Sequence, residues 1–518
     1  MQRLFALTAV VCLLLAGRPS TSPAAATDVV VSVRASAAQG AVAMRLGTQF
    51  AWPGALDRAP AARTRFSALA PRLVRINATT DGLPGLPLVM PAGVTQGDWD
   101  FGNLDAIIDD IRNAGGQIVL DIAYAPQWMW DCSVGAIRDP TFGEFAAYIA
   151  RVLSYYNVGS FVAEDGRTII NPAGTANRIG YWELWNEPDQ RTLGCPPAGN
   201  PNIGPDQYVT MWNASVAAML AIDPSIKLVG PSTSSAVTTT VPDYLPTLLS
   251  GAAHKPDAVS FHAYGGWHNS QTDRFLFDGD VGCCGLPGIE SGLARVQAAA
   301  PGIPVWITEL NVNAAWAQDD PARRPWTAFG AAWGASAFVR LARHGVEAVY
   351  EFQFAHPSLR QFSLVEIDTG RPLLSYWRDY YLARYFPPGS TLVSTSSSSG
   401  VVEVLAARPP GSSDVRVLVV NRQVDSDTAL GGPGVPASVR VTVEDLPGVE
   451  AVSLRQIDAL TPLETGPELQ SLQAANSVSI GFGGYGLALL EFVSDLNANL
   501  RAPAKTSPTG TPPLPAGR

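Results

Sequence analysis

The sequence predicts an α/β fold in which a (β/α)8 TIM barrel is followed by a C-terminal antiparallel β-sandwich. Three observations predict this fold class. Short apolar strands alternate with amphipathic helices from about residue 44 to residue 387, two of these strands deliver a glutamate at their end, and strands separated by turns replace this rhythm from Ser390 onward. At roughly 100–200 residues per domain, a chain of 518 residues has room for both domains.

The barrel is predicted from eight strands separated by helical segments. The clearest helix covers residues 101–116, where Leu104, Ile107, Ile108 and Ile111 recur on one face. Periodicity alone also permits an open doubly wound sheet, but no glycine-rich phosphate loop opens a helix in this sequence, which favours the closed barrel. The predicted strands are 44–52, 73–77, 117–124, 179–184, 226–230, 258–264, 305–310 and 348–354.

The domain limits are predicted from changes in composition. They are a signal peptide at 1–26, the barrel at 27–387, the β-sandwich at 388–495 and a disordered, Pro-rich tail at 496–518. A β-branched run at 29–33 follows the signal peptide and is a candidate to pair with the later domain. The predicted sandwich strands are 401–405, 415–421, 439–443, 452–457, 477–480 and 486–493.

The first residues have the layout of a secretory signal peptide. Arg3 supplies a short basic region, an apolar run follows at 4–16, and small residues end at Ala26. Because this run is too short to span a membrane, we predict a secreted or periplasmic protein without membrane insertion. A lipoprotein attached through Cys12 is the weaker alternative, since Val11 is larger than the residue that such a site favours.

The composition limits the class of partner. Hydrophobic residues make up 47% of the chain and charged residues 15%, with a formal net charge of −10. A negative chain of low charge density suits neither nucleic acid nor anionic lipid. We therefore expect a neutral or weakly charged substrate, and the sequence leaves the oligomeric state open.

Removal of the signal would leave Cys132, Cys195, Cys283 and Cys284, an even number that suits disulfides in an exported chain. Cys132 follows the third predicted barrel strand and Cys195 the fourth, so we predict a disulfide between them. Cys283 and Cys284 would then form a strained vicinal bridge or stay as two thiols. A metal site is disfavoured because no histidine accompanies them at ligand spacing.

Two strands place a glutamate at the end that forms the catalytic face of a barrel. The run Tyr-Trp-Glu-Leu-Trp-Asn-Glu-Pro-Asp at 181–189 carries Glu187, and Pro188, which cannot donate to a ladder, ends the strand. The run Pro-Val-Trp-Ile-Thr-Glu-Leu-Asn at 304–311 carries Glu309 in the same layout. Since strands four and seven lie on opposite walls, we expect the two carboxylates to face each other, as retaining glycosidases require.

These runs resemble the clan A glycoside hydrolases, and among them most closely glycoside hydrolase family 39. The resemblance covers about residues 43–493. It implies that Glu187 is the acid/base, that Glu309 is the nucleophile and that Asn186 donates a hydrogen bond to the sugar 2-hydroxyl. For a reaction of this kind we predict that no metal and no organic cofactor is needed.

The resemblance extends to neighbouring strands. Phe-His-Ala-Tyr at 261–264 is similar to the clan's His-x-Tyr site, which implies that His262 and Tyr264 bind substrate near Glu309, and Arg75 matches the arginine that supports the nucleophile. His262 could instead be an ordinary hydrogen-bonded barrel histidine. Glu183 is better explained as a buried partner of Arg75, because an unpaired buried charge is costly. The segment 351–356 lacks the clan's frequent tryptophan, which leaves the sugar undecided.

Several tryptophans fall in the segments that follow predicted strands. Trp128, Trp267 and Trp316 are predicted to bind substrate, since aromatic faces suit the apolar faces of sugars. Trp52 and Trp130 occupy similar places. Any one of them could simply pack, but several at one rim favour a cleft for several sugar units over a tight exo pocket.

The sequence therefore predicts a secreted, retaining O-glycoside hydrolase that cleaves an extracellular polysaccharide or oligosaccharide by double displacement. One alternative is an exo-acting enzyme of the β-xylosidase or α-L-iduronidase kind, the latter disfavoured because few basic residues in the active-site loops could meet a uronate. A transglycosylase would use the same two glutamates. The alternative from another class is a non-catalytic carbohydrate-binding surface protein on the same fold.

Overall fold

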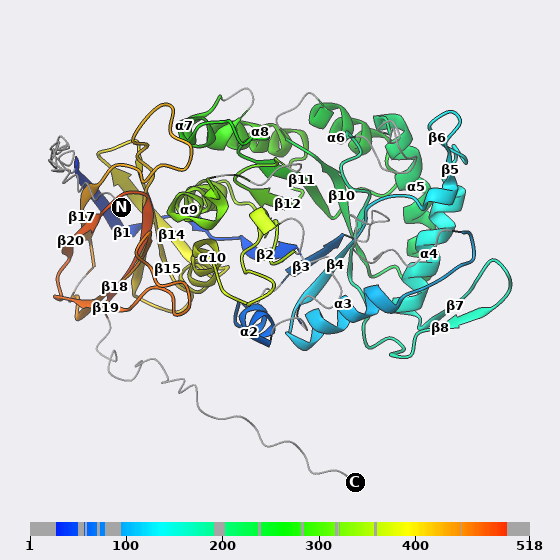
Figure 1. Cartoon of the computed structure of the whole chain (residues 1–518), viewed down its shortest axis with the longest axis horizontal. Helices are drawn as coiled ribbons and strands as arrows, with labels where there is room; N and C mark the ends of the chain where they lie inside the picture. Colours follow the sequence, from blue (N-terminus) through cyan, green and yellow to red (C-terminus); the bar gives the residue numbers. More distant parts are fainter. Residues whose placement is uncertain are drawn as a thin grey trace, which may run out of the picture.

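The computed structural model describes residues 27–49, 56, 60–69, 73–77, 95–190, 203–236, 240–280, 284–315, 320, 322–356, 360–446 and 448–494. They form two bodies side by side, a β/α barrel and a β-rich domain (Figure 1). The predicted signal peptide and tail lie outside the described residues. Among the helices that are described, none has both the length and the apolar character needed to cross a membrane.

Eight parallel strands close into a barrel, which confirms the predicted fold class and excludes the open sheet. The predicted strands 73–77 and 258–264 match the observed ones to the residue. Others differ at their ends, where fraying makes boundaries least certain in sequence. Around the barrel the strands are β2 (Arg45–Gln49), β3 (Leu73–Asn77), β4 (Gln117–Ile122), β9 (Tyr181–Leu184), β10 (Lys227–Thr233), β11 (Ala258–Tyr264), β12 (Val305–Asn311) and β13 (Ala348–Glu351).

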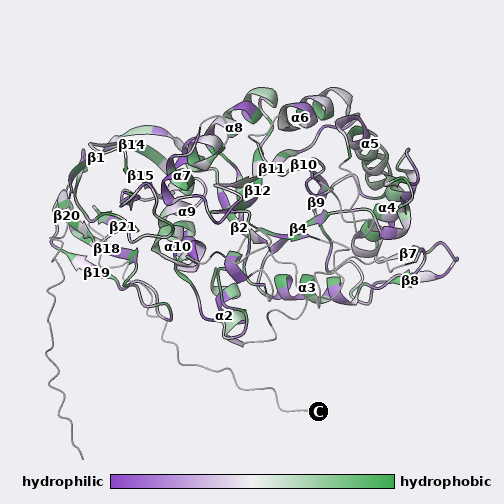
Figure 2. Ribbon diagram, turned by 45° about the horizontal axis from the view of Figure 1, so that its top comes forward, coloured by the Kyte–Doolittle hydropathy of each residue, from purple (hydrophilic) through white to green (hydrophobic). Residues whose placement is uncertain are grey.

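Helices surround the barrel and bury one face against it. In α3, Leu104, Ile107, Ile108 and Ile111 are buried as their spacing predicts, and hydrophobic and hydrophilic patches alternate along the helix (Figure 2). The helices are α2 (Pro60–Leu69), α3 (Gly102–Asn113), α4 (Gly143–Asn157), α5 (Pro205–Ile222), α6 (Thr240–Gly251), α7 (Asp273–Asp278), α8 (Gly285–Ala299), α9 (Ala328–Arg343) and α10 (Leu374–Tyr385).

Short elements decorate the connections of the barrel. Two small hairpins, which the sequence analysis did not predict, project from the region around α4 (Figure 1). They are β5 (Trp130–Asp131) with β6 (Ala136–Ile137) and β7 (Ser160–Val162) with β8 (Thr168–Ile170). The 3-10 turns are η1 (Gln127–Met129), η2 (Arg324–Trp326) and η3 (Arg360–Phe362).

In the second domain, nine strands form one continuous hydrogen-bonded sheet. The inner faces of its two halves pack together around a single hydrophobic core. Val441 of one half and Leu490 of the other belong to the same buried cluster, so the sheet folds over itself as a sandwich. In spatial order the strands are β19 (Gln470–Leu472), β18 (Ala451–Asp458), β21 (Gly486–Val493), β16 (Val415–Asn421), β15 (Val402–Arg408), β14 (Thr391–Ser397), β1 (Thr27–Ala41), β17 (Ala437–Glu444) and β20 (Ser477–Phe482).

One predicted boundary needs correction, because residues 27–41 do not belong to the barrel. They form β1, which pairs antiparallel with β14 and parallel with β17 in the second domain. The alternating Val29, Val31 and Val33 are buried in the sandwich core, so the first strand of the chain completes its last domain. The suggested pairing of the run at 29–33 with the later domain is confirmed.

The two domains share an apolar interface built around α9. Phe329 of α9 packs edge-on against Tyr485 of the sandwich, with ring centroids 5.3 Å apart. A single buried cluster contains barrel residues together with Leu418 and Leu487 of the sandwich. Apolar burial of this kind holds domains in one arrangement rather than leaving them loosely tethered.

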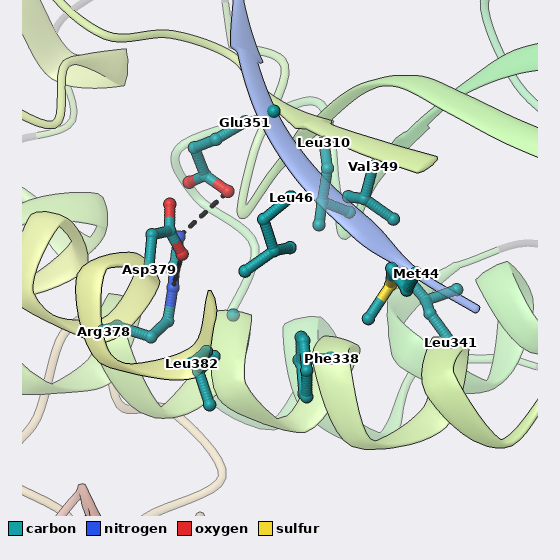
Figure 3. Close-up of a pocket in the computed structure, with 12 residues that line it drawn as sticks. Met44, Leu46, Leu310, Phe338, Leu341, Val349, Glu351, Arg378, Asp379 and Leu382 are labelled. Atoms are coloured by element: carbon teal, nitrogen blue, oxygen red, sulfur yellow. Dashed lines mark hydrogen bonds and ion pairs between the residues drawn. The ribbon is translucent and has the colours of Figure 1, made fainter. Parts of the chain in front are cut away.

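A buried ionic group lies between β13 and α10, beside a small cavity (Figure 3). The Arg378 guanidinium lies 2.9 Å from Glu351 Oε2 and 2.7 Å from Asp379 Oδ1. Gly334 makes room for it, since a Cβ at that position would come within 1.9 Å of Arg378 Nη1. Burial raises the pKa of Glu351 to about 7, against the lowering effect of Arg378.

Candidate active site

Glu187 stands on the turn that follows β9, at the carboxyl end of the barrel strands. Trp185 and Glu187 take left-handed backbone conformations, with φ of 71° and 47°. Such conformations are uncommon in residues with a side chain and persist where surrounding bonds hold them. The amide of Glu187 donates to the carbonyl of Ser232 at 2.9 Å, and that of Asn186 donates to Ala123 at 2.9 Å. The turn is thus tied to the chain on both sides, which fixes the direction of the Glu187 side chain.

Glu309 lies on β12, and both of its carboxylate oxygens are held. Oε1 accepts a hydrogen bond from Arg75 Nη1 at 2.8 Å, and Oε2 accepts one from the Tyr264 hydroxyl at 2.5 Å. Burial, together with the charge of Glu309, raises the pKa of Tyr264 well above its usual value, so the phenol keeps its proton. Glu309 is therefore oriented from two sides, with 7% of its side chain exposed.

His262, on β11, lies between the two glutamates. Its Nδ1 is 2.7 Å from Glu187 Oε1 and 3.4 Å from Glu309 Oε2, while its Nε2 is 3.2 Å from Ser232 Oγ. Burial alone would lower the pKa of His262, but the charge of Glu309 and the hydrogen bond with Glu187 outweigh burial and raise the pKa. The predicted closeness of Glu187, His262, Tyr264 and Glu309 is what the structure shows.

One oxygen of each glutamate and one nitrogen of His262 lie within 4.8 Å of one another. Atoms of these types at such distances can also hold a divalent metal. The cationic guanidinium of Arg75, 2.8 Å from Glu309, works against a metal by occupying one carboxylate oxygen and repelling a second positive charge. The predicted absence of a metal remains a prediction.

Arg75, on β3, is completely buried at the centre of the barrel. Burial would lower its pKa, but the carboxylates around it outweigh burial and raise the pKa above its ordinary value, so the guanidinium stays charged. Acceptors come from strands on every side of it: Gln49 Oε1 at 2.7 Å, Asp121 Oδ2 at 2.9 Å, Glu183 Oε2 at 2.6 Å, Asn186 Oδ1 at 2.9 Å, Ser232 Oγ at 3.3 Å and Glu309 Oε1 at 2.8 Å.

The pairing of Glu183 with Arg75 is confirmed, and Asp121 shares this role. The two carboxylates are register partners on β9 and β4, and both are fully buried. Within the described part of the chain, Glu183 Oε1 and Asp121 Oδ1 have no hydrogen-bond partner. Burial raises the pKa of Asp121 well above its usual value, although Arg75 acts in the opposite direction. A carboxyl that keeps its proton here lowers the charge that one arginine must balance.

The sequence analysis missed Asp121, Gln49 and Ser232. The signal for Asp121 was available, because it is the one charged residue in the apolar strand 117–122. Ser232 gave no such signal, because its place depends on the left-handed turn of the backbone at that residue, where φ is 54°.

Asn186 points its two amide atoms at different neighbours. Its Oδ1 accepts from Arg75, and its Nδ2 donates to the Tyr124 hydroxyl at 3.2 Å. The side chain is thereby anchored beside Glu309 through the shared arginine. Its predicted hydrogen bond to a sugar hydroxyl is compatible with this position and stays a prediction.

The predicted tryptophan platforms fall into different environments. Trp267 follows β11 closely, and 48% of its surface is exposed. Trp128 is partly buried, with the Arg138 guanidinium 5.8 Å from its ring centroid. Trp130 is buried, while Trp52 and Trp316 lie outside the described residues. Trp267 is therefore the best supported candidate for stacking on a sugar.

Cys132 lies in the turn between β5 and β6. Its predicted partner Cys195, like Cys283, lies outside the described residues, so the disulfide remains a prediction.

Burial lowers the pKa of His356 to about 4, so this residue is neutral near pH 7.

Comparison with known proteins shows the fold. No protein-family model matches the chain, and no curated protein matches it. Among solved structures, it is similar to a monomeric β-xylosidase from Caulobacter crescentus CB15, with a TM-score of 0.63 and 18% identity over 90% of this chain and 99% of that one. It is also similar to the GH39 enzyme from Xanthomonas axonopodis pv. citri, with a TM-score of 0.63 and 17% identity over 92% and 99%.

A third similar structure is a family 51 α-L-arabinofuranosidase from Bifidobacterium longum, with a TM-score of 0.61 and 14% identity over 91% of this chain and 100% of that chain. Both domains take part in these matches, since about nine-tenths of the chain is covered each time. The barrel with an attached sandwich is thus a shared architecture, whereas the activity has to be argued from the site.

Proposed function

We propose that this chain is a secreted, retaining O-glycoside hydrolase that acts on an oligosaccharide or polysaccharide. The observation that carries the proposal is the approach of Glu187 and Glu309, which have carboxylate oxygens within 4.8 Å of each other. Retaining glycosidases keep their carboxyl groups roughly 5–5.5 Å apart, whereas inverting enzymes leave roughly 6.5–9.5 Å for a water molecule. The names of the similar structures, β-xylosidase and α-L-arabinofuranosidase among them, support the same class of substrate.

The proposed reaction has two steps. Glu309 attacks the anomeric carbon while Glu187 gives its proton to the leaving glycosidic oxygen, so that the carbon–oxygen bond breaks and a glycosyl ester of Glu309 forms. Water then attacks the same carbon, Glu187 takes the proton of that water, and Glu309 leaves as a carboxylate. Each residue ends in the protonation state in which it began.

The held geometry of Glu309 suits a nucleophile. Arg75 and Tyr264 occupy one lone-pair direction on each oxygen, so the carboxylate is presented in a single orientation. Glu187 is more open, with 25% of its side chain exposed, as a group that exchanges protons with a leaving group and with water must be. This contrast supports the assignment of the two roles.

The experiment compares wild type, Glu187→Ala and Glu309→Ala on a panel of aryl glycosides and polysaccharides, following product size and anomeric configuration. The expected results are retention of configuration by wild type, loss of activity in Glu309→Ala, and rescue of Glu187→Ala by azide on an activated aryl glycoside. Glu347→Ala is the control. Glu347 directly precedes β13, at the amino end of the barrel strands and therefore away from the two catalytic glutamates, and it pairs with Arg45. Inverted product, or equal losses in all three variants, would contradict the proposal.

The same panel separates the alternatives. Release of single sugars alone would favour an exo-acting enzyme of the β-xylosidase kind, and transfer to an added acceptor sugar would favour a transglycosylase. Glycan binding without cleavage would favour the non-catalytic binding protein. The 48% exposure of Trp267 favours a cleft for more than one sugar.

Export and the disulfide are also part of the proposal. They are supported by the signal-like residues 1–26 and by the even number of cysteines after them. N-terminal sequencing of the exported protein is expected to begin near residue 27. Mass spectrometry of unreduced peptides is expected to join Cys132 to Cys195, and a different partner for Cys132 would contradict that pairing.

A further inference from the structure

The short helix α7 belongs to the barrel in sequence but is held by the sandwich. It follows the loop that carries Trp267, and its first residue, Asp273, is fully buried. Asp273 Oδ1 accepts from the amide of Gly431 at 2.7 Å, and Oδ2 accepts from the amide of Gly432 at 2.9 Å. The amide of Asp273 donates to the carbonyl of Ala429 at 2.8 Å. Three bonds thus join α7 to one loop of the other domain.

That loop covers residues 424–434, between β16 and β17, and we call it the sandwich loop. It makes further contacts with α7 through the ion pair of Asp427 with Arg274. Just before it, Arg422 pairs with Asp278 at the other end of α7 and with Glu403 at 2.7 Å. Both ends of α7 are therefore attached to the sandwich domain.

Contacts continue from α7 to Trp267. Phe275 of α7 meets the Trp267 ring edge-on, with centroids 6.0 Å apart. Gln271, just before α7, accepts hydrogen bonds at its Oε1 from the amides of Trp267 at 2.6 Å and His268 at 2.8 Å. The backbone and the ring of Trp267 are thus contacted by residues 271 and 275, which lie on either side of Asp273.

Arg324 also holds the segment that runs from Asn269 to Asp273. It is fully buried, donates to the carbonyls of Gln271 at 2.5 Å and Asn269 at 2.8 Å, and lies 3.6 Å from Asp273 Oδ1. Gly431 fits closely beside it, since a Cβ there would come 2.6 Å from Ala322 and 3.2 Å from Arg324. The sandwich loop, Arg324 and the Trp267 loop are therefore packed as one unit.

We propose that the sandwich loop is a specificity-determining element of the active site, which positions Trp267 as a stacking platform for a sugar beyond the one that is cleaved. The ligand would be an oligosaccharide of at least two units rather than a single glycoside. The proposal rests on the proposed glycosidase function. It assigns Asp273 and Gly431 as positioning residues, because they act on the glycan only through Trp267.

The test compares two glycines of the sandwich domain that have nearly the same φ angle. Gly431 and Gly411 have φ of 72° and 69°, but a Cβ at Gly411 would meet nothing within 4 Å. Gly431→Ala and Gly411→Ala therefore carry a similar backbone penalty, and only Gly431→Ala disturbs the packing against Ala322 and Arg324. The first readout is hydrogen exchange of the amides at 265–272, which is expected to speed up in Gly431→Ala and not in Gly411→Ala.

The second readout is KM and kcat on an aryl monoglycoside and on an oligosaccharide. Gly431→Ala is expected to raise KM for the oligosaccharide roughly three- to tenfold, as for a weakened aromatic contact, and to leave the aryl monoglycoside unchanged. Trp267→Ala should produce the same selective loss, and the double variant should lose no more than Trp267→Ala alone.

Unchanged exchange at 265–272 in Gly431→Ala, additive losses in the double variant, or equal effects on both substrates would each overturn the inference while the glycosidase function stands. If wild type neither cleaves nor binds any glycan, the proposed function has failed, and the glycan part of the inference fails with it. Faster exchange in Gly431→Ala would then show only that the loop supports α7.

Discussion

The Tyr264 hydroxyl lies 2.5 Å from Oε2 of Glu309 and donates to it, on the oxygen that Arg75 does not bind. In the proposed mechanism this hydrogen bond orients the Glu309 carboxylate for attack. In the second step it stabilises the negative charge of Glu309 as the glycosyl ester breaks. A hydrogen bond to a charged group contributes about 1.5–3 kcal/mol, so Tyr264→Phe is expected to lower kcat roughly 10- to 100-fold.

The control for this change is Tyr350→Phe. Tyr350 is also a buried barrel tyrosine, but its hydroxyl has no hydrogen-bond partner among the described residues. Its variant is expected to keep wild-type kcat, measured by initial rates on the best aryl glycoside of the panel. Equal losses in the two variants would mean that packing of the ring, and not the bond to Glu309, matters for catalysis.

Arg75 is expected to be as important for stability as for activity. It is the cation that the fully buried carboxylates of Asp121 and Glu183 share with Glu309. Removing one partner of a buried ionic group costs about 3–5 kcal/mol, because the others are left uncompensated. Arg75→Met is therefore expected to lower the free energy of unfolding by that amount in urea titrations at pH 7.

Arg34→Met is the matched control, since Arg34 lies 3.6 Å from Glu444 with 62% of its side chain exposed. Exposed pairs contribute about 0–1 kcal/mol. A loss in Arg75→Met no larger than in Arg34→Met would show that the buried carboxylates are neutralised without the arginine.

Sequence reasoning worked where one strand or one turn decides the outcome. Short apolar runs separated by helical segments predicted the barrel strands. The position of Glu187 and Glu309 at strand ends predicted that the two carboxylates lie close together, and in the structure both lie within 3.4 Å of His262 Nδ1. It failed where the deciding contact comes from far along the chain. The pairing of the run at 29–33 with the later domain was predicted, but the domain limit at residue 27 wrongly gave β1 to the barrel. The Ser-rich β14, which pairs with β1 from more than 300 residues away, was not predicted, because that pairing stabilises it rather than its own propensity. The role of Asp273 depends on the sandwich loop, so no local pattern around it could have revealed it.

His262 is expected to make stability depend on pH. The charge of Glu309 and the hydrogen bond with Glu187 raise its pKa above the ordinary value of about 6.5 in spite of burial. A group with a raised folded-state pKa adds stability that is complete below the unfolded-state pKa and is lost as the pH rises through the folded-state pKa. The difference in unfolding free energy between wild type and His262→Gln should therefore be largest near pH 5.5 and should shrink toward pH 9. A difference that grows with pH would contradict this account.

Glu351 gives a second pH dependence, away from the active site. Burial raises its pKa from 4.5 to about 7, so the folded protein holds a proton there that the unfolded chain has released between those values. The group is protonated in both states below pH 4.5 and ionised in both above pH 7, so stability falls as the pH rises through this window. At 1.36 kcal/mol per pKa unit, the loss is about 3 kcal/mol.

Glu351→Gln has nearly the same shape and cannot ionise, while Arg378 keeps its bond to Asp379 at 2.7 Å. The variant is therefore expected to gain stability relative to wild type as the pH rises from 4.5 to 7.5, measured by urea unfolding at half-unit steps. Glu347→Gln, directly before the same strand and 36% exposed, is the control that should follow the wild-type curve. A constant difference between wild type and Glu351→Gln over this range would mean that Arg378 holds Glu351 ionised throughout, and that the buried group is a permanent ion pair rather than a titrating one.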